Sequence, residues 1–363
     1  MMGTARSTWS RQRAKAVPAV TVLMGVHNGA QFLAETIESV AAQTFSDYEF
    51  VIVDDGSSDA TSEILANAAV YDPRIRILTN ETNVGLTKSL NRGLREARGE
   101  FIARIDADDV CLPQRLAVQH AHMQQHGRDV GVTSGYVVID AEGRKIRVTD
   151  EAMDDWQVRW MLGWNPPAPH PTFFFRRCPD GQTPIFYDET YRTAQDFDLW
   201  GRLAQMGSTR RLPDVLIQYR RHEGAITHAK RHEQAQNCAE IGRINSAARL
   251  PTGIAAKLEP LIAMFSYNAK AEPKAIRAAI DGANAMVEHD VAGAPSARHG
   301  RWVRQMTAGL LADAILSRAG GLSSPKSIAA FAWRARGHLP HLARAVLGDP
   351  GTALKSLRGR RRG

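Results

Sequence analysis

The chain has 363 residues, with 46 Lys and Arg against 38 Asp and Glu, and a formal net charge of +8. Its hydrophobic content of 44% excludes an intrinsically disordered protein, and no apolar run approaches the roughly 20 residues that span a bilayer. The basic balance favours polyanionic partners, which are nucleic acid, anionic lipid or phosphorylated small molecules.

Short apolar segments alternate with helical patterns after a basic lead-in, residues 1–18, that we expect to be disordered. This alternation is typical of βαβ units, so we expect an α/β fold with a mostly parallel sheet flanked by helices. The carboxyl ends of such strands lie at one edge of the sheet, where ligands bind. The predicted strands are Ala19–Val26, Tyr48–Val53, Arg74–Leu78 and Glu100–Ile105, and the predicted helices are Ala30–Ala42, Ala60–Val70 and Gly85–Ala97.

The pattern becomes mixed after residue 131. A hairpin is predicted around Ala141–Gly143, and from Arg231 the chain is Ala-rich and helical. We therefore predict an α/β domain over residues 19–230, an α-helical C-terminal region over 231–350 and a basic tail over 351–363. Between the hairpin and the C-terminal region we predict helices near Asp154–Leu162 and Ala194–Met206 and strands at Thr172–Arg176 and Val215–Arg221.

Acidic side chains directly follow two of the predicted strands. Asp54 and Asp55 follow the second strand, where a carboxylate can accept hydrogen bonds from a ribose hydroxyl or a base N–H. A plain turn before a helix N-cap explains this pair equally well. Asp106, Asp108 and Asp109 follow the fourth strand, and such clustered carboxylates repel one another unless a cation such as Mg²⁺ or Mn²⁺ is bound. A solvated acidic turn is the weaker explanation, because two strand ends carry acids.

Asp196 lies at the start of the predicted helix Ala194–Met206. A carboxylate at a helix N-terminus is expected to have a lowered pKa, so Asp196 would stay ionised and able to accept a proton. A simple N-cap role is the alternative. The basic cluster Tyr219–His222 could hold phosphates, and His170 stands alone; for both, a structural role is an equal alternative.

In their order and spacing, these motifs resemble those of family 2 glycosyltransferases, which have a GT-A (Rossmann-like) fold. The resemblance covers about Ala19 to Thr227 and does not reach the C-terminal helices. It implies inverting transfer of a sugar from a nucleotide-sugar, above all a UDP-sugar, to an acceptor hydroxyl by a hexosyl- or N-acetylhexosaminyl-transferase. The runs that carry it include VTVLMGVHNGAQFL, YEFVIVDDGSSDAT, NVGLTKSLNRGLREARGEFIARIDADD, HPTFFFRR, QDFDLW and YRRHEGAIT.

The resemblance also implies individual roles. Asp196 matches the catalytic base, and Asp106 and Asp108 match the DxD pair that binds Mn²⁺ or Mg²⁺, with Asp108 as the main metal ligand. Asp55 would contact the uridine with Asp54 beside it, and His27 occupies the family's usual Tyr position against the base. The implied nucleotide-sugar-binding residues are His27, Asn28, Asp54, Asp55, Lys88, Asp106 and Asp108.

The chain departs from the family pattern at Gly25 and His27, where Pro and Tyr are commonest, and at Gln195, which replaces the usual Glu. It lacks a QxxRW motif after the base, which points to addition of a single sugar in surface polysaccharide or glycolipid assembly. A nucleotidyltransferase is one alternative, but HNGAQFL lacks the expected Gly- and basic-rich loop. A non-catalytic nucleotide-sugar-binding protein is the other, and it would not need Asp196.

The expected partners are a nucleotide-sugar donor and a glycan or lipid-linked acceptor, with no nucleic acid; a homo-oligomer is left open. The three cysteines match no metal spacing, and no apolar segment follows the basic N-terminus, so we expect a cytoplasmic protein without a signal peptide. The segment His338–Leu347 and the Arg-rich end favour docking on the inner face of the cytoplasmic membrane. The alternative is that the C-terminal helices pack against the catalytic domain or a second subunit.

Overall fold

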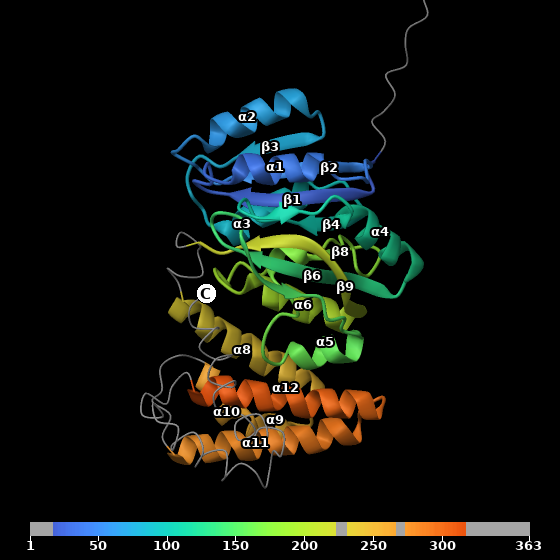
Figure 1. Cartoon of the computed structure of the whole chain (residues 1–363), viewed down its shortest axis with the longest axis vertical. Coiled ribbons are helices and arrows are strands. Elements are labelled where there is room, and N and C mark those ends of the chain that lie inside the picture. Colours follow the sequence, from blue (N-terminus) through green and yellow to red (C-terminus); the bar gives the residue numbers. More distant parts are fainter. Residues whose placement is uncertain (1–16, 223–230, 266–272, 317–363) are drawn as a thin grey trace, which may run out of the picture.

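The computed structural model describes residues 17–222, 231–265 and 273–316 and centres on a nine-stranded sheet (Figure 1). Along the main path of the sheet the strands follow the order β3-β2-β1-β4-β8-β6-β9-β5, and β7 pairs with β6. The predicted α/β class is therefore confirmed. The lead-in up to residue 16, the segment His338–Leu347 and the basic tail lie outside the described residues.

The first four strands are parallel, as predicted. β1 (Val20–Val26) pairs with β2 (Tyr48–Asp54) on one side and with β4 (Phe101–Arg104) on the other, and β3 (Ile75–Thr79) extends the sheet beyond β2. Every residue of β1, β2 and β4 is buried, which explains why these segments are continuously apolar rather than alternating. Their shared direction brings their carboxyl ends to one edge.

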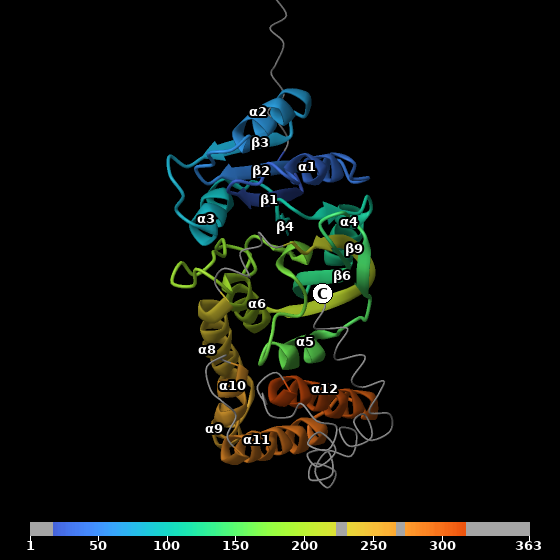
Figure 2. The same ribbon diagram turned by 60° about the vertical axis from the view of Figure 1, so that its left-hand side comes forward.

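Helices cover both faces of this parallel part (Figures 1 and 2). Alternate strand residues belong to two separate hydrophobic clusters, because successive side chains of a strand point to opposite faces. Leu23 and Val51 pack with α3 (Leu86–Glu96), whereas Val22 and Phe50 belong to the cluster that includes residues of α1 (Leu33–Ala41) and α2 (Thr61–Tyr71).

The second half of the sheet is mixed, so the prediction of a mostly parallel sheet holds only up to β4. β8 (Phe174–Arg176) lies antiparallel between β4 and β6 (Asp129–Ile139). The apolar pattern of a short strand predicts its existence but not its direction. β9 (Ser208–Arg220) runs parallel to β6, and the predicted hairpin is confirmed by the antiparallel pairing of β6 with β7 (Lys145–Thr149).

Three helices and two short elements connect these strands. β5 (Val110–Cys111) pairs with β9 and leads into α4 (Arg115–Gln125). The others are α5 (Asp155–Met161), the 3-10 helix η1 (His170–Thr172) and α6 (Gln195–Met206). The sequence predicted α5, α6 and β8 within a few residues, but it placed the start of β9 at Val215 instead of Ser208. The first half of β9 is rich in Arg, so its sequence does not predict a strand. It is a strand because it pairs with β6.

The C-terminal helices pack directly against the α/β part (Figures 1 and 2). Buried residues of both regions form one hydrophobic cluster, in which the Trp160 and Trp302 ring centroids lie 5.1 Å apart. Trp160 Nε1 also donates to Asp290 Oδ2 at 3.0 Å. No helix in the described ranges is long and apolar enough to cross a membrane. The helices are α8 (Arg231–Arg249), α9 (Thr252–Lys257), α10 (Glu259–Phe265), α11 (Pro273–Ala292) and α12 (Ala297–Leu316).

A tight turn after β2 depends on Gly56, which has a φ of +68°. A Cβ atom built there would lie 2.6 Å from the backbone carbonyl carbon of Thr82. The turn therefore needs glycine for two reasons, backbone conformation and close approach of another chain segment. It orients the loop that begins with Asp55.

We predict that Gly56→Ala lowers the free energy of unfolding more than Gly143→Ala does. Gly143 has a φ of +79° but no atom within 4 Å of a built Cβ, so this control bears only the conformational cost of about 1–2 kcal/mol. At Gly56, displacement of the Thr82 backbone should increase the loss in the free energy of unfolding by about 1–3 kcal/mol. Urea unfolding of both variants measures the difference, and equal losses would contradict the close approach.

Candidate active site

The residues singled out from the sequence gather at the carboxyl edge of the sheet. His27 and Asn28 follow β1, Asp54 ends β2 with Asp55 next, and the acidic cluster Asp106–Asp109 follows β4. The end of β9 adds Arg220–His222, because Arg220 and His222 both bond to that acidic cluster. The strand directions explain this convergence, since parallel strands end at a common edge.

Asp54 and Asp55 organise the loops at this edge. Asp54 is buried, and its two carboxylate oxygens accept hydrogen bonds from Ser57 N and Ser62 Oγ. Asp55 Oδ1 accepts from Asn80 Nδ2 and Val84 N, and Oδ2 accepts from Gly85 N at 2.9 Å. Burial alone would raise the pKa of Asp55, but hydrogen bonds from Val84, Asn80 and other donors together lower it. Asp55 is thus an ionised carboxylate whose Oδ2 retains acceptor capacity.

His27, Asn28 and Lys88 are exposed at the same edge. His27 Nδ1 donates to the carbonyl oxygen of Asp55 at 2.9 Å, which fixes the ring against the Asp55 backbone. Asn28 adopts a φ of +52°, and its Oδ1 accepts from Ser58 N at 2.8 Å. Lys88 lies in the first turn of α3. The contact of these residues with a nucleotide-sugar stays a prediction.

The acidic cluster after β4 concentrates negative charge in a buried place. The carboxyl of Asp109 is fully buried; Oδ1 accepts from Arg220 N at 2.7 Å, and Oδ2 has no hydrogen-bond partner among the described residues. Burial, followed by repulsion from Asp108 and Asp106, raises the pKa of Asp109 well above its usual range. Burial and Asp106 likewise raise the pKa of Asp108.

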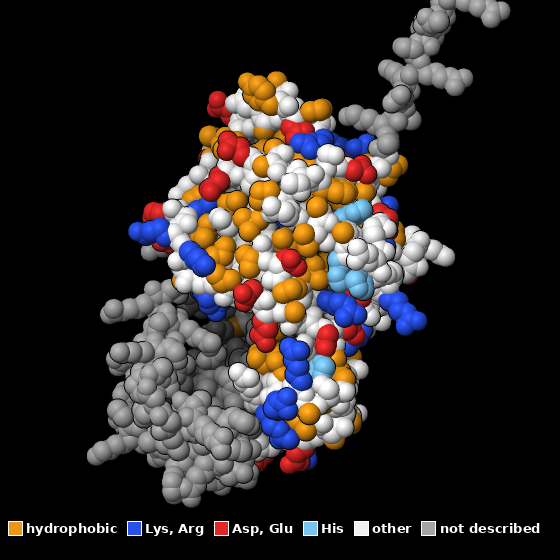
Figure 3. Space-filling model, turned by 45° about the vertical axis from the view of Figure 1, so that its right-hand side comes forward, with side chains coloured by type: hydrophobic (Ala, Val, Ile, Leu, Met, Phe, Trp, Pro, Cys, Tyr) orange, Lys and Arg blue, Asp and Glu red, His pale blue; other side chains and the backbone are white. Residues whose placement is uncertain are grey.

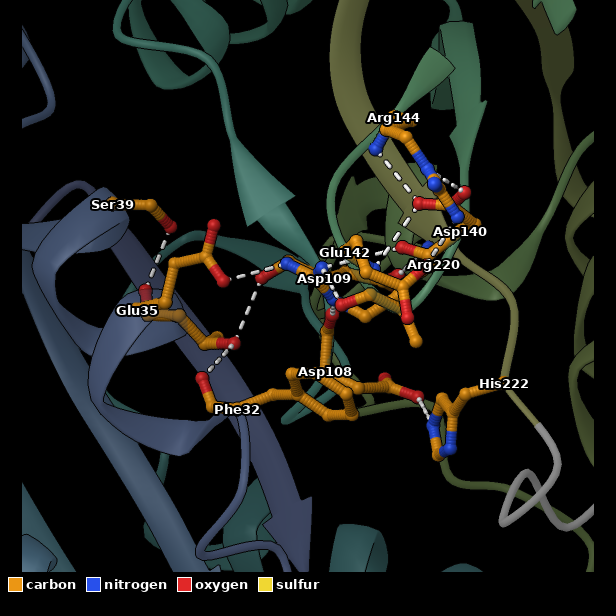
Figure 4. Close-up of polar contacts among 12 residues, drawn as sticks. Phe32, Glu35, Ser39, Asp108, Asp109, Asp140, Glu142, Arg144, Arg220 and His222 are labelled. Atoms are coloured by element: carbon orange, nitrogen blue, oxygen red, sulfur yellow. Dashed lines mark hydrogen bonds and ion pairs between the residues drawn. The ribbon is translucent and has the colours of Figure 1, made fainter. Parts of the chain in front are cut away.

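Two basic residues at the end of β9, Arg220 and His222, approach Asp108 (Figure 4). His222 Nε2 lies 2.9 Å from Asp108 Oδ2, and Figure 4 shows the two side chains pointing toward one another. Arg220 is 3% exposed, and its Nε donates to the Asp108 carbonyl oxygen at 2.8 Å. Its Nη2 forms an ion pair with Glu35 of α1 at 2.6 Å. Arg220 therefore joins the acidic loop to α1 and to the end of β9.

These donor groups fit a divalent cation. Asp108 Oδ2 and His222 Nε2 are an oxygen and a nitrogen ligand 2.9 Å apart, and the nearby Asp109 Oδ2 has no hydrogen-bond partner among the described residues. Mn²⁺ accepts such mixed oxygen and imidazole ligands, and Mg²⁺ accepts the carboxylates. Asp106 turns instead to Arg104, with 2.5 Å between Asp106 Oδ1 and Arg104 Nη2. Its role as a second metal ligand stays a prediction.

The expectation of a lowered pKa for Asp196 is wrong. Asp196 lies in the first turn of α6, but burial raises its pKa to about 6, and the hydrogen bond from Phe197 N and the charge of Arg104 offset only part of this effect. The rise in the pKa of Asp196 caused by desolvation therefore exceeds the lowering caused by the helix N-terminus. Ala194, which precedes the helix, has a φ of +61°, an uncommon conformation for a residue with a Cβ.

A buried arginine links the two acidic groups. Arg104 is fully buried, forms the ion pair with Asp106 and acts electrostatically on Asp196. Burial, together with the positive charge of Arg104, lowers the pKa of His170 to well below its usual range. His170 is buried and lies 2.8 Å from the hydroxyl of Tyr187, which confirms a structural role for it. Because that histidine is neutral, Arg104 is the nearby cation for Asp196.

Sequence reasoning missed Arg104 and Arg220 as parts of the site. The signal for Arg104 was a charged residue inside an apolar strand, two positions before Asp106. Arg220 belongs to the basic cluster Tyr219–His222, and its buried guanidinium donates to Asp108, Ala141 and Glu35, so protein groups rather than a phosphate engage it here. His222 is in place beside Asp108 and was not chosen.

Comparisons with known proteins show the family and the fold of the chain. Residues 21–188 match the model of glycosyl transferase family 2, a match that ends before Asp196. The chain is 35% identical over 194 residues to the putative glycosyltransferase EpsE of Bacillus subtilis, covering 52% of this chain and 68% of that one. It is 36% identical over 136 residues to the succinoglycan biosynthesis protein ExoO of Rhizobium meliloti, covering 38% of each chain.

The fold is similar to that of S. aureus TarS 1–349, solved in complex with UDP-GlcNAc. The TM-score is 0.55 at 18% sequence identity, and the match covers 82% of this chain and 88% of TarS 1–349. This likeness concerns the fold alone, which is the expected GT-A fold with a helical C-terminal region. Because the family model matches residues 21–188 and the chain is 35% identical to EpsE over 68% of the length of EpsE, the chain belongs to glycosyl transferase family 2.

Proposed function

We propose that this enzyme transfers one sugar, a hexosyl or N-acetylhexosaminyl group, from a UDP-sugar to an acceptor hydroxyl with inversion. The observation that carries the proposal is a carboxylate with a pKa of about 6, Asp196, at the same sheet edge as the cation-type ligands Asp108 and His222. A direct displacement needs these two parts and no nucleophile from the protein. The base acts on the acceptor, and the cation site acts on the leaving diphosphate.

Asp196 accepts the proton of the acceptor hydroxyl as that oxygen attacks the anomeric carbon. A base with a pKa near the operating pH is ionised enough to act and basic enough to take a proton, and such help contributes about 10²–10⁴ in rate. The pKa of about 6 fits this task. The buried positive charge of Arg104 keeps the carboxylate ionised despite its desolvation.

Asp108 and His222 would hold the divalent cation, and Arg220 holds their loop in place through its bonds to Asp108 and Asp109. A bound Mn²⁺ or Mg²⁺ ion neutralises the negative charge that develops on the departing diphosphate. Asp55 and His27 provide the nucleotide end of the site, since Asp55 Oδ2 has acceptor capacity left and the exposed His27 ring lies against the Asp55 backbone. That TarS was solved with UDP-GlcNAc supports a uridine nucleotide as the first donor to test.

We place the acceptor among glycans and lipid-linked glycans. The name of the relative ExoO, a succinoglycan biosynthesis protein, supports an extracellular or surface polysaccharide as the product class. The C-terminal helices described here use their apolar faces against the α/β part, so membrane docking rests only on the segments beyond residue 316. A peripheral contact with the cytoplasmic membrane remains part of this proposal.

The first prediction concerns the base. Asp196→Asn should lower kcat by about 10² or more and leave donor binding nearly unchanged, because the proton acceptor is lost and the binding groups are not. Asp198→Asn is the matched control on the same helix; Asp198 pairs with Arg202 at 2.7 Å instead. In the unchanged enzyme, kcat should fall as the pH is lowered through about 6, because Asp196 becomes protonated. Equal loss of donor affinity would make Asp196 a binding residue.

The second prediction concerns the cation. Asp108→Ala should lower transfer by at least about 10²-fold and leave the melting temperature close to that of the unchanged enzyme. Asp188 is exposed and its carboxylate accepts hydrogen bonds from Thr190, so Asp188→Ala offers a control that removes an acid outside the cluster. Transfer assays with EDTA and with added Mn²⁺ complete the comparison. Transfer that survives both the substitution and EDTA would rule out the metal role.

The third prediction concerns the nucleotide. UDP should raise the melting temperature only when Mn²⁺ or Mg²⁺ is present, and at a hundred times its Kd it should stabilise the protein by about 2.7 kcal/mol. Thermal melts with UDP, GDP and CDP, each with and without the ion, test this. A larger shift with GDP than with UDP would overturn the uridine contacts assigned to Asp55 and His27.

A further inference from the structure

A second group of potential metal ligands lies away from the active site. His122 and His126 are four residues apart at the end of α4, and Asp129 is the first residue of β6. One ligand atom from each of the three lies within 4.8 Å of those of the other two. Residues four apart on a helix share one face, so both imidazoles point to the same side.

This group is at the opposite edge of the sheet from the active site. β6 runs from Asp129 to Ile139, and Ile139 is paired with Arg220, which binds the acidic loop. At a rise of about 3.3 Å per residue, the length of β6 separates the two places by about 33 Å. Figure 3 brings forward the side of the molecule on which Figure 1 places α4, and His side chains gather on this face. No group of the proposed transferase reaction is involved.

The hydrogen bonds determine which nitrogen of His126 is free. Its Nδ1 lies 2.9 Å from the carbonyl oxygen of His122, and a carbonyl can only accept, so Nδ1 carries a proton. The Nε2 atom of the neutral ring therefore has a free lone pair. A ring N–H bound to a backbone carbonyl is the usual way in which proteins orient a metal-ligating histidine. The rings of His122 and His126 are stacked, with centroids 4.1 Å apart and 14° between their planes.

Asp129 supplies a buried carboxylate with an unused oxygen. It is 1% exposed, and its Oδ1 has no hydrogen-bond partner among the described residues. Its Oδ2 accepts from His122 Nε2 at 2.8 Å and from Arg210 Nε at 2.9 Å. Arg210 weakens the attraction of this carboxylate for a cation, so the site suits an ion that gains more from imidazole nitrogen than from negative charge.

We propose that His122, His126 and Asp129 bind a borderline divalent transition-metal ion, Zn²⁺ in the first place. Two imidazole nitrogens and one carboxylate oxygen are ligands that zinc accepts in a four-coordinate site, with water as the fourth ligand, whereas Mg²⁺ prefers oxygen ligands alone. Zinc bonds of about 2.0–2.2 Å place ligand atoms about 3.3 Å apart. The three ligand atoms lie within 4.8 Å of one another here, so binding would draw the exposed His126 closer to the other two residues.

Binding requires one proton rearrangement. His122 Nε2 donates to Asp129 in the ion-free site, so it must lose that proton to become a ligand. The ring keeps its neutral form by carrying the proton on Nδ1 instead, and Arg210 remains on the carboxylate. The ion would then join the end of α4 to the start of β6 across the loop of residues 126–128.

The experiment is a calorimetric titration of Zn²⁺ into the tag-free full-length protein with saturating Mg²⁺, which occupies the oxygen ligands of the active site. Asp108→Ala serves as a second background without the active-site ligand. We expect one zinc site per chain in both backgrounds, and an affinity at least about tenfold lower in His126→Ala. Because His126 is exposed, this variant should fold normally, and its far-UV circular dichroism checks that.

His120→Ala is the matched control. His120 lies on the same helix but does not belong to the proposed site, because its ring packs on Phe45 and Phe101. It should bind zinc as the unchanged protein does. Co²⁺ in place of Zn²⁺ should give the visible absorption bands of a four-coordinate ion in the unchanged protein and in His120→Ala, but not in His126→Ala. Equal zinc affinity in all three proteins, or no binding to any, would overturn the proposal.

Discussion

The mutual repulsion of carboxylates at one end of the sheet is the constraint on which the rest of this structure depends. Asp106, Asp108 and Asp109 follow a buried strand, and burial together with their mutual repulsion raises the pKa of the latter two. Each carboxylate has its own partner: Arg104 pairs with Asp106, His222 contacts Asp108, and the backbone N–H of Arg220 donates to Asp109. The mixed half of the sheet therefore contributes to the site, because β9, which runs parallel to β6, brings Arg220 and His222 to the acidic loop.

Asp196 and the acidic loop are coupled through Arg104. The guanidinium is buried completely, and the described residues leave its Nε and Nη1 without hydrogen-bond partners, so its charge is little screened. Interactions in such a medium are stronger than at the surface. Arg104 therefore acts from a buried position on both Asp106 and Asp196. These two acids of the candidate site share one buried cation.

Much of the fold could be predicted from the sequence, because buried parallel strands are apolar runs and their connecting helices have a 3.6-residue period. Asp54, Asp55, Asp106 and Asp108 were found for the same reason, since each follows a recognisable strand. The reversed direction of β8, the early start of β9 and the partners of Arg220 could not be predicted, because contacts between residues far apart in the sequence leave no local pattern. The pKa of Asp196 was misjudged, because the helix N-terminus is visible in the sequence and the desolvation is not.

The bond from Arg220 N to Asp109 Oδ1 joins residues 111 positions apart, and this separation has a consequence for biosynthesis. The ribosome makes the acidic loop long before it makes the strand whose backbone N–H bonds to it. Until residue 220 has left the exit tunnel, the sheet cannot bury Asp109 without leaving its Oδ1 atom unpaired. The half-made chain should therefore keep this edge open and hydrated, and closure of the active site becomes one of the last steps in folding of the α/β part.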